Sequence, residues 1–232
     1  MGIKDEMFKL LEKFNEIRRS MIGSDSIELI PTINDANEYV NKIAKLSNDY
    51  KLNCAWQCLA DGLNIEKSIN ELYNYVSDSE RAFFISNEFR KIILSSSVLS
   101  SSVIALIMGK IIKADRKCTH KEAIILNAVG NMTDYDLKNF KIMMESAVDE
   151  LAGCEIINIS KLDEENRDSY KYTLRICVNG GIFLLENNLI ENSQEDYETV
   201  YEGPHYIVVE MAYTLIEYIE EVKQLLNYGD NN

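Results

Sequence analysis

One stretch of the chain, Ile92 to Gly109 (IILSSSVLSSSVIALIMG), has no formal charge over 18 residues and limits the possible folds most strongly. Its apolar residues and serines fall on every side of a helical wheel. A helix that is apolar all round lies either in the centre of a protein core or across a membrane. The sequence predicts a central helix over residues 88–113.

The flanks of this stretch help to separate the two possibilities. Its nine Ile, Leu and Val residues favour membrane insertion by about 3 to 5 kcal/mol, and its six serines offset part of that. Basic residues lie on both sides, Arg90 and Lys91 before it and Lys110 and Lys113 after it, so the charge asymmetry typical of a membrane span is missing. We therefore expect a helix buried in protein and keep a membrane-attached protein as an alternative.

Composition places the chain among globular proteins. An apolar content of 46% over 232 residues excludes a disordered chain and is enough for one large domain or two small ones. Five cysteines, an odd number, with an amphipathic N-terminus in place of a secretory signal, predict free thiols in the cytoplasm. The many Ile, Asn, Lys and Tyr residues have AT-rich codons, which indicates an AT-rich bacterium or one of its phages.

Charge divides the chain unevenly. Residues 121–232 contain 22 of the 38 Asp and Glu residues but 8 of the 24 Lys and Arg residues, so the whole net charge of −14 lies there. Such a field repels phosphate backbones and favours basic partners, although a solvated acidic surface is the plain alternative.

Apolar periodicity predicts mostly helices in the first half. They are expected over residues 4–21, 34–50, 52–63, 65–76 and 79–93, the last capped by Ser77 or Asp78. The polar segment 113–119 then predicts a domain boundary, with a helical region over 1–115 and an acidic region over 116–232.

The second half predicts helices and short strands. Thr119 with Glu122 has the spacing of a capping box for a helix over 120–129, and Thr133 caps a helix that continues to Leu151. Further on we expect a strand over 154–162, helices over 170–187 and 182–193, a strand over 206–209 and a helix over 211–226. Gly180 and Gly181 are expected to kink or restart a helix.

The order of these elements over residues 120–226, with the LLENNLI turn at Asn188, resembles winged-helix modules of uncharacterised bacterial and phage proteins. The resemblance implies a winged-helix-like α+β region with a small β wing. Together with the helices expected in the first half, the sequence predicts a mainly α fold, in which an N-terminal helical bundle around a buried apolar helix precedes this region.

Winged helices often bind DNA, and the charge pattern opposes that use here. The expected recognition helix offers only Lys171 and Arg175 as cations, and the expected wing, residues 191–203, contains five acidic residues and no Lys or Arg. Affinity for DNA depends on neutralised phosphates, so nucleic acid is an unfavoured partner and a DNA-binding regulator is the alternative.

A protein partner, and a basic one, is the favoured interpretation. Eight of the 13 tyrosines lie from Tyr170 onward, and tyrosines alternate with carboxylates around the wing. Tyrosine is enriched in interfaces, and acidic neighbours steer a basic partner. The candidate binding residues are Tyr197, Glu198, Tyr201, Glu202 and Tyr206. Some of these tyrosines could simply complete the core of the wing, and homo-oligomerisation is left open.

Catalytic and metal sites find little support. Cys54 and Cys58, one helical turn apart, and Cys118 with His120 lack the spacing of a known zinc finger, so we expect buried thiols and no cofactor. His120 and His205 are the only histidines, and no phosphate-binding glycine loop or hydrolase motif is present. The sequence predicts a noncatalytic binding or regulatory module, an inhibitor or adaptor encoded by a phage or mobile element.

Overall fold

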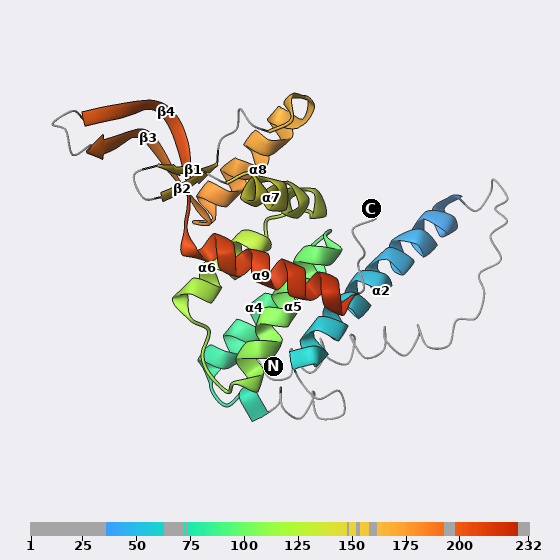
Figure 1. The fold of residues 1–232 in the computed structure, drawn as a ribbon. Helices are drawn as coiled ribbons and strands as arrows, with labels where there is room; N and C mark the ends of the chain where they lie inside the picture. Colours follow the sequence, from blue (N-terminus) through green and yellow to red (C-terminus); the bar gives the residue numbers. More distant parts are fainter. Residues whose placement is uncertain are drawn as a thin grey trace. The chain divides into compact units, whose positions relative to one another are not determined.

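A computed structural model describes residues 36–62, 72, 74–147, 149–151, 154–157, 162–192 and 198–226. For residues 36–46, 149–151, 154, 187–192 and 198–204 it describes the backbone alone. The protein is mainly helical, with a small antiparallel sheet (Figure 1). The helix predicted over residues 4–21 lies outside the described residues, as does most of that over 65–76.

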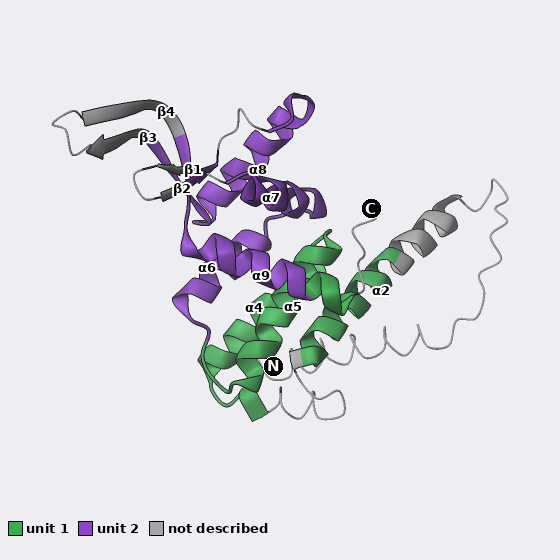
Figure 2. Cartoon of the chain, viewed as in Figure 1, with its two compact units in different colours: residues 1–117, 222–232 green, residues 118–221 purple. Residues whose placement is uncertain are grey.

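The chain forms two compact units, residues 1–117 with 222–232 and residues 118–221 (Figure 2). The division that the sequence predicts, 1–115 and 116–232, stays a prediction. The two units are described separately below.

The first unit contains α2 (Ala36–Gly62), α4 (Ser79–Leu94) and α5 (Val98–Lys113), and α5 packs against both other helices. Helix α2 is continuous, so the prediction of two helices over 34–50 and 52–63 was wrong. No helix breaker separates Tyr50 from Leu52, and Lys51 and Leu52 are both buried. The predicted Asp78 cap of α4 is confirmed.

The long apolar stretch is not one helix, so the prediction of a central helix over 88–113 was wrong. Helix α4 ends at Leu94, Ser95 is extended, and Ser97 caps α5 by accepting a hydrogen bond from the amide of Ser100 at 2.8 Å. The side chain of Lys51 donates to the carbonyls of Ile93, at 3.0 Å, and of Ser95. A cation is favourable at the C-terminal end of a helix, where carbonyls lack partners. Lys51 therefore stabilises the break.

The predicted burial of the apolar helix is confirmed for α5. From Ser100 to Gly109 every residue is buried. The hydroxyls of Ser101 and Ser102 donate to carbonyls one turn earlier, so they cost little inside the core. At 16 residues, α5 is about 24 Å long, less than the roughly 30 Å of a bilayer core. In the part of the chain that is described, no helix has the length and apolarity needed to cross a membrane.

The residues that follow α5 are attached to the start of α4. Arg81 donates to the carboxylate of Asp115 at 2.6 Å and to its carbonyl at 3.0 Å. The same guanidinium lies 4.6 Å from the centre of the Tyr75 ring, within range of a cation–π interaction. Asp115 has a φ of 46°, a left-handed conformation that Asp tolerates better than most residues. These contacts fix the path of the chain as it leaves α5.

The second unit begins with α6 (His120–Val129) and α7 (Asp134–Glu145), and both starts confirm the sequence prediction. Thr119 with Glu122 and Thr133 with Asp136 form capping boxes. Helix α7 ends at Glu145, so its predicted extension to Leu151 was wrong, because Asp149–Leu151 forms strand β1.

The sheet consists of β1, β2 (Cys154–Ile157), β3 (Phe183–Asn192) and β4 (Glu198–Val208), in the order β1-β2-β4-β3 with antiparallel neighbours. The 3₁₀ turn η3 (Glu164–Asn166) and α8 (Arg167–Asn179) lie between β2 and β3 in sequence, and α9 (Glu210–Leu225) follows β4. Strand β2 and helix α9 agree with the predictions, and residues 158–161 of the predicted strand lie outside the described residues.

The prediction of helix over 170–187 and 182–193 was wrong beyond Asn179, because residues 183–192 are strand β3. Helix α8 ends at Gly180, and Gly181 has a φ of 73°, where a side chain would be strained. A Cβ on Gly180 would lie 2.7 Å from the Cβ of Ala128, so α8 approaches α6 too closely for any side chain there. The glycine pair turns the chain out of α8 and into the sheet.

A buried polar network joins α7 to α8. The carboxylate of Asp136 accepts from the hydroxyl of Thr173 at 2.9 Å and from Thr133 at the start of α7. The amide of Asn139 donates to Ser169 at 2.7 Å and to Thr173 at 3.2 Å. Buried polar groups that satisfy one another specify one packing of the two helices.

Candidate protein-binding surface

Most of the predicted binding residues lie on one strand rather than in a loop. Glu198, Tyr201 and Glu202 belong to β4, where they pair with Asn192, Leu189 and Asn188 of β3. Their side chains, like the whole of Tyr197, lie outside the described part of the chain. Tyr206, near the end of β4, is half-buried between its partners Leu185 on β3 and Ile157 on β2.

The segments Phe183–Glu186 and His205–Val208, called here the hairpin base, anchor the two long strands. Phe183 is fully buried, and its ring centre lies 5.5 Å from that of Phe140 on α7. Ile156 and Ile157 of β2 pair with Ile207 and Tyr206. The base is therefore held by the sheet on one side and by the helical core beneath it.

The hairpin base also exposes apolar side chains. Leu184 is 52% exposed and Leu185 45% exposed. Successive residues of a strand point to opposite faces, so Leu184 shares a face with Ile207 and Leu185 shares the other with Tyr206. Sequence reasoning missed both leucines as surface residues because it placed them in a helix, where LL would face a core.

Beyond the base, β3 and β4 form a two-stranded arm, residues 187–192 and 198–204. A bulge lies at its start, since Asn187 of β3 stands opposite Gly203 and Pro204 of β4. Proline has no amide proton and is tolerated in a sheet where the ladder is interrupted. The extra residue is on β4, so the pairing edge of β3 remains continuous.

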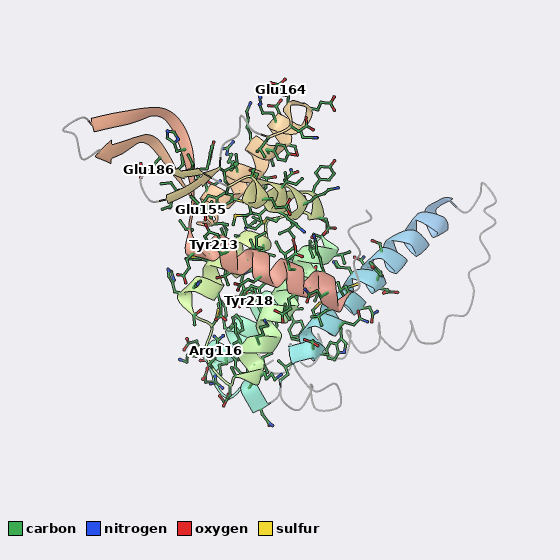
Figure 3. The ribbon with its side chains drawn as sticks, in the orientation of Figure 1. Arg116, Glu155, Glu164, Glu186, Tyr213 and Tyr218 are labelled. Atoms are coloured by element: carbon green, nitrogen blue, oxygen red, sulfur yellow. The ribbon has the colours of Figure 1, made fainter. Side chains whose placement is uncertain are left out.

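Two carboxylates, Glu186 and Glu155, lie at the hairpin base. Glu186 is exposed on β3, next to Leu185 and opposite His205 (Figure 3). Tyr213 of α9 donates its hydroxyl to the carboxylate of Glu155 on β2. Partial desolvation and this carboxylate raise the pKa of Tyr213 to about 12. The hydrogen bond holds the start of α9 to the sheet.

Most described basic side chains of the second unit are already paired with carboxylates. Between helices, Lys121 pairs with Glu210 at 2.6 Å and Lys141 with Glu220 at 3.0 Å. Within or next to α8, Arg167 pairs with Glu164 at 3.0 Å and Lys171 with Asp168 at 3.1 Å. The exposed carboxylates that remain, Glu165, Glu186 and Glu217 among them, leave the described surface of the second unit acidic.

The two residues predicted for DNA contact, Lys171 and Arg175, are both exposed on α8. Lys171 forms an ion pair with Asp168. Exposed ion pairs of this kind are weak, so the pair does not prevent Lys171 from contacting another anion. Helix α8 ends at Asn179, nine residues before Asn188, so the helix that the sequence offers for DNA contact is shorter than predicted. Two cations on one short helix provide few of the phosphate contacts on which DNA affinity depends.

The thiols considered as metal ligands are placed as core or linker residues. Cys54 and Cys58 are buried in α2, and burial raises the pKa of the Cys54 thiol, which disfavours the thiolate that metals bind. Cys118 is half-buried and His120 exposed. Among the described residues, no group of three His, Cys, Asp or Glu side chains is placed to hold a metal ion. Burial also raises the pKa of Cys177, so this thiol is a poor nucleophile.

Comparisons of the chain with protein-family models, with curated proteins and with solved structures gave no match.

Proposed function

We propose that this protein is a noncatalytic binding module whose second unit holds a basic protein partner on the acidic surface around the hairpin base. The observation that carries the proposal is the internal pairing of cations, Lys121, Lys141, Arg167 and Lys171, in a half of the chain with a net charge of −14. The surplus carboxylates attract cations from outside and repel polyanions.

Apolar area at the same place supports a protein partner over a small cation. Leu184 and Leu185 are about half exposed, and half-buried Tyr206 lies beside Leu185. Interfaces combine an apolar centre containing aromatic residues with a polar rim. Here Glu155 and Glu186 would form part of the rim.

A winged-helix-like arrangement of the second unit belongs to this proposal. Helix α8 is followed directly by the β3–β4 hairpin, and α7 packs against α8. We infer that the hairpin is the wing and that this protein uses it for protein contact, because one fold serves many kinds of site.

The proposal is tested by isolating the partner from the native host with the tagged full-length chain and measuring its affinity for purified variants. The double variant Leu185→Ser, Tyr206→Ala is expected to weaken binding at least tenfold. Tyr172→Ala, which removes a 70% exposed tyrosine from α8, is the control and should bind like the wild type. Equal affinity of all three proteins would reject the hairpin base as the binding surface.

A mobility-shift assay with duplex DNA at low salt tests the alternative, a DNA-binding regulator. We expect no shift, because two exposed cations on α8 face an acidic surround. A shift that vanishes with added salt and with Lys171→Ala would favour the alternative.

A further inference from the structure

Among the described strands, β3 lies at an edge of the sheet. In the order β1-β2-β4-β3 it pairs only with β4 among the described strands, and it is 10 residues long. The strand at the opposite edge, β1, has 3 residues. An edge strand presents a row of unpaired amide and carbonyl groups that can accept another strand.

Three features that often protect an edge are missing from β3. Its sequence, FLLENNLIEN, contains no proline and no lysine, and the extra residue of the bulge lies on β4. Every residue of β3 therefore keeps an amide proton. At the base, buried Phe183 anchors the strand against Phe140, so an added strand would meet a preformed template.

Charge decides which strand fits. The strands β3 and β4 contain four Glu residues, Glu186, Glu191, Glu198 and Glu202, and neither contains Lys or Arg. A second copy of this chain would bring an equally acidic hairpin to the edge, and like charges across strands are unfavourable. A segment with lysines or arginines would instead face these carboxylates.

We propose that a basic segment of a partner protein binds along β3 in an extended conformation and adds one strand to the sheet. This inference rests on the proposed function and specifies how the partner is held. Main-chain hydrogen bonds provide affinity in such complexes, and alternate side chains provide specificity. Glu186 shares a face with Leu184, while Leu185 and Tyr206 share the other. A segment that alternates cationic and apolar residues can therefore place a cation beside Glu186 and an apolar residue beside Leu185.

The test uses the full-length protein and a synthetic peptide of alternating Lys and Val, as long as the 10 residues of β3. Binding is measured by fluorescence anisotropy, and amide hydrogen exchange locates it. We expect slowed exchange in β3.

A peptide N-methylated at two adjacent central residues cannot donate main-chain hydrogen bonds there from either of its edges. We expect its affinity to be lower by at least about tenfold. Glu186→Gln should weaken binding about two- to fivefold, because it removes one cross-strand charge pair. Glu217→Gln, the same charge change on α9, is the control.

Three results separate the outcomes. Loss of affinity on N-methylation together with protection of β3 supports strand addition. Equal binding of the methylated peptide, without protection of β3, overturns it while leaving a basic partner bound by charge alone. No binding of either peptide, together with an isolated partner that binds the hairpin-base variant as well as the wild type, overturns both the strand addition and the proposed function.

Discussion

At the scale of single residues, the hydroxyl of Thr173 is central to the packing of α7 on α8. It donates to Asp136 and accepts from Asn139 in a fully buried position. Thr173→Val keeps the shape but leaves both partners short of a hydrogen bond, and we expect a loss of about 1–3 kcal/mol in the free energy of unfolding. Urea denaturation measures it.

Thr214→Val is the matched control for this prediction. Among the described residues, the Thr214 hydroxyl donates to the carbonyl of Glu210 in its own helix, at 3.3 Å, and to no other group. Its loss should change the free energy of unfolding by less than about 0.5 kcal/mol. If Thr173→Val were as harmless as the control, the buried network would not stabilise the helix pair.

Glu88 makes the stability of the first unit depend on pH. Its side chain is buried in α4, with one oxygen 2.9 Å from Lys91, and burial raises its pKa above the usual 4.5. A raised pKa means that the folded state holds the proton more tightly than the unfolded state. Protonated Glu88 therefore stabilises the folded state. This contribution is complete below the pKa of Glu88 in the unfolded chain and is lost as the pH rises through its pKa in the folded protein.

Glu88→Gln removes this dependence. We expect the free energy of unfolding of the variant, relative to that of the wild type, to increase when the pH is raised from about 4 to about 8. Chemical denaturation at the two pH values checks this, with Glu80→Gln, an exposed position of the same helix, as control. A difference between Glu88→Gln and wild type that is the same at both pH values would contradict the prediction.

At the scale of elements, the crossing of α6 and α8 depends on Gly180. The Cβ of Gly180→Ala would lie 2.7 Å from that of Ala128. We expect a loss of about 1–3 kcal/mol in the free energy of unfolding, because the core cannot move aside without cost. Thermal unfolding measures it, and Ala128→Gly in the same chain should restore part of the loss.

Gly181→Ala distinguishes crowding from backbone strain. Its Cβ would meet only Ile124, at an ordinary 3.5 Å, but its φ of 73° is unfavourable for alanine. Ala128→Gly is therefore expected to leave the cost of Gly181→Ala unchanged. Rescue of both variants alike would show that contact with Ala128 is not what Gly180 relieves.

The sequence predicted those element boundaries that depend on local chemistry. Thr119 and Thr133 mark helix starts because a hydroxyl and a carboxylate three residues later cap the same amides. Residues 183–192 were predicted as helix because LLENNLI also fits helical spacing, and its pairing with β4 depends on residues 198–208. Leu184 and Leu185 were missed as surface residues for the same reason, while Tyr206 was named from its acidic surroundings.

At the scale of the whole molecule, like charges in residues 121–232 repel one another, since this half has a net charge of −14. Salt screens that repulsion over about 10 Å at 0.1 M ionic strength. We expect the melting temperature to rise by a few degrees between low salt and about 0.5 M sodium chloride, because the surplus of carboxylates exceeds the weak surface ion pairs. Calorimetry measures the shift.

The triple variant Asp163→Asn, Glu164→Gln, Glu165→Gln removes three neighbouring exposed charges and should reduce this salt effect. A melting temperature that falls as salt is added would mean that ion pairs such as Lys121–Glu210 outweigh the repulsion.

Lys51 reaches the end of α4 from more than 40 positions earlier in the chain. Because a chain is synthesised from its N-terminus, α2 has left the ribosome before Ile93 and Ser95 emerge. Lys51, which stabilises the break between α4 and α5, is therefore available before the uncharged stretch is fully synthesised. The order of synthesis thus favours two short helices over a single long apolar helix, which is the form that a membrane insertion machinery would recognise.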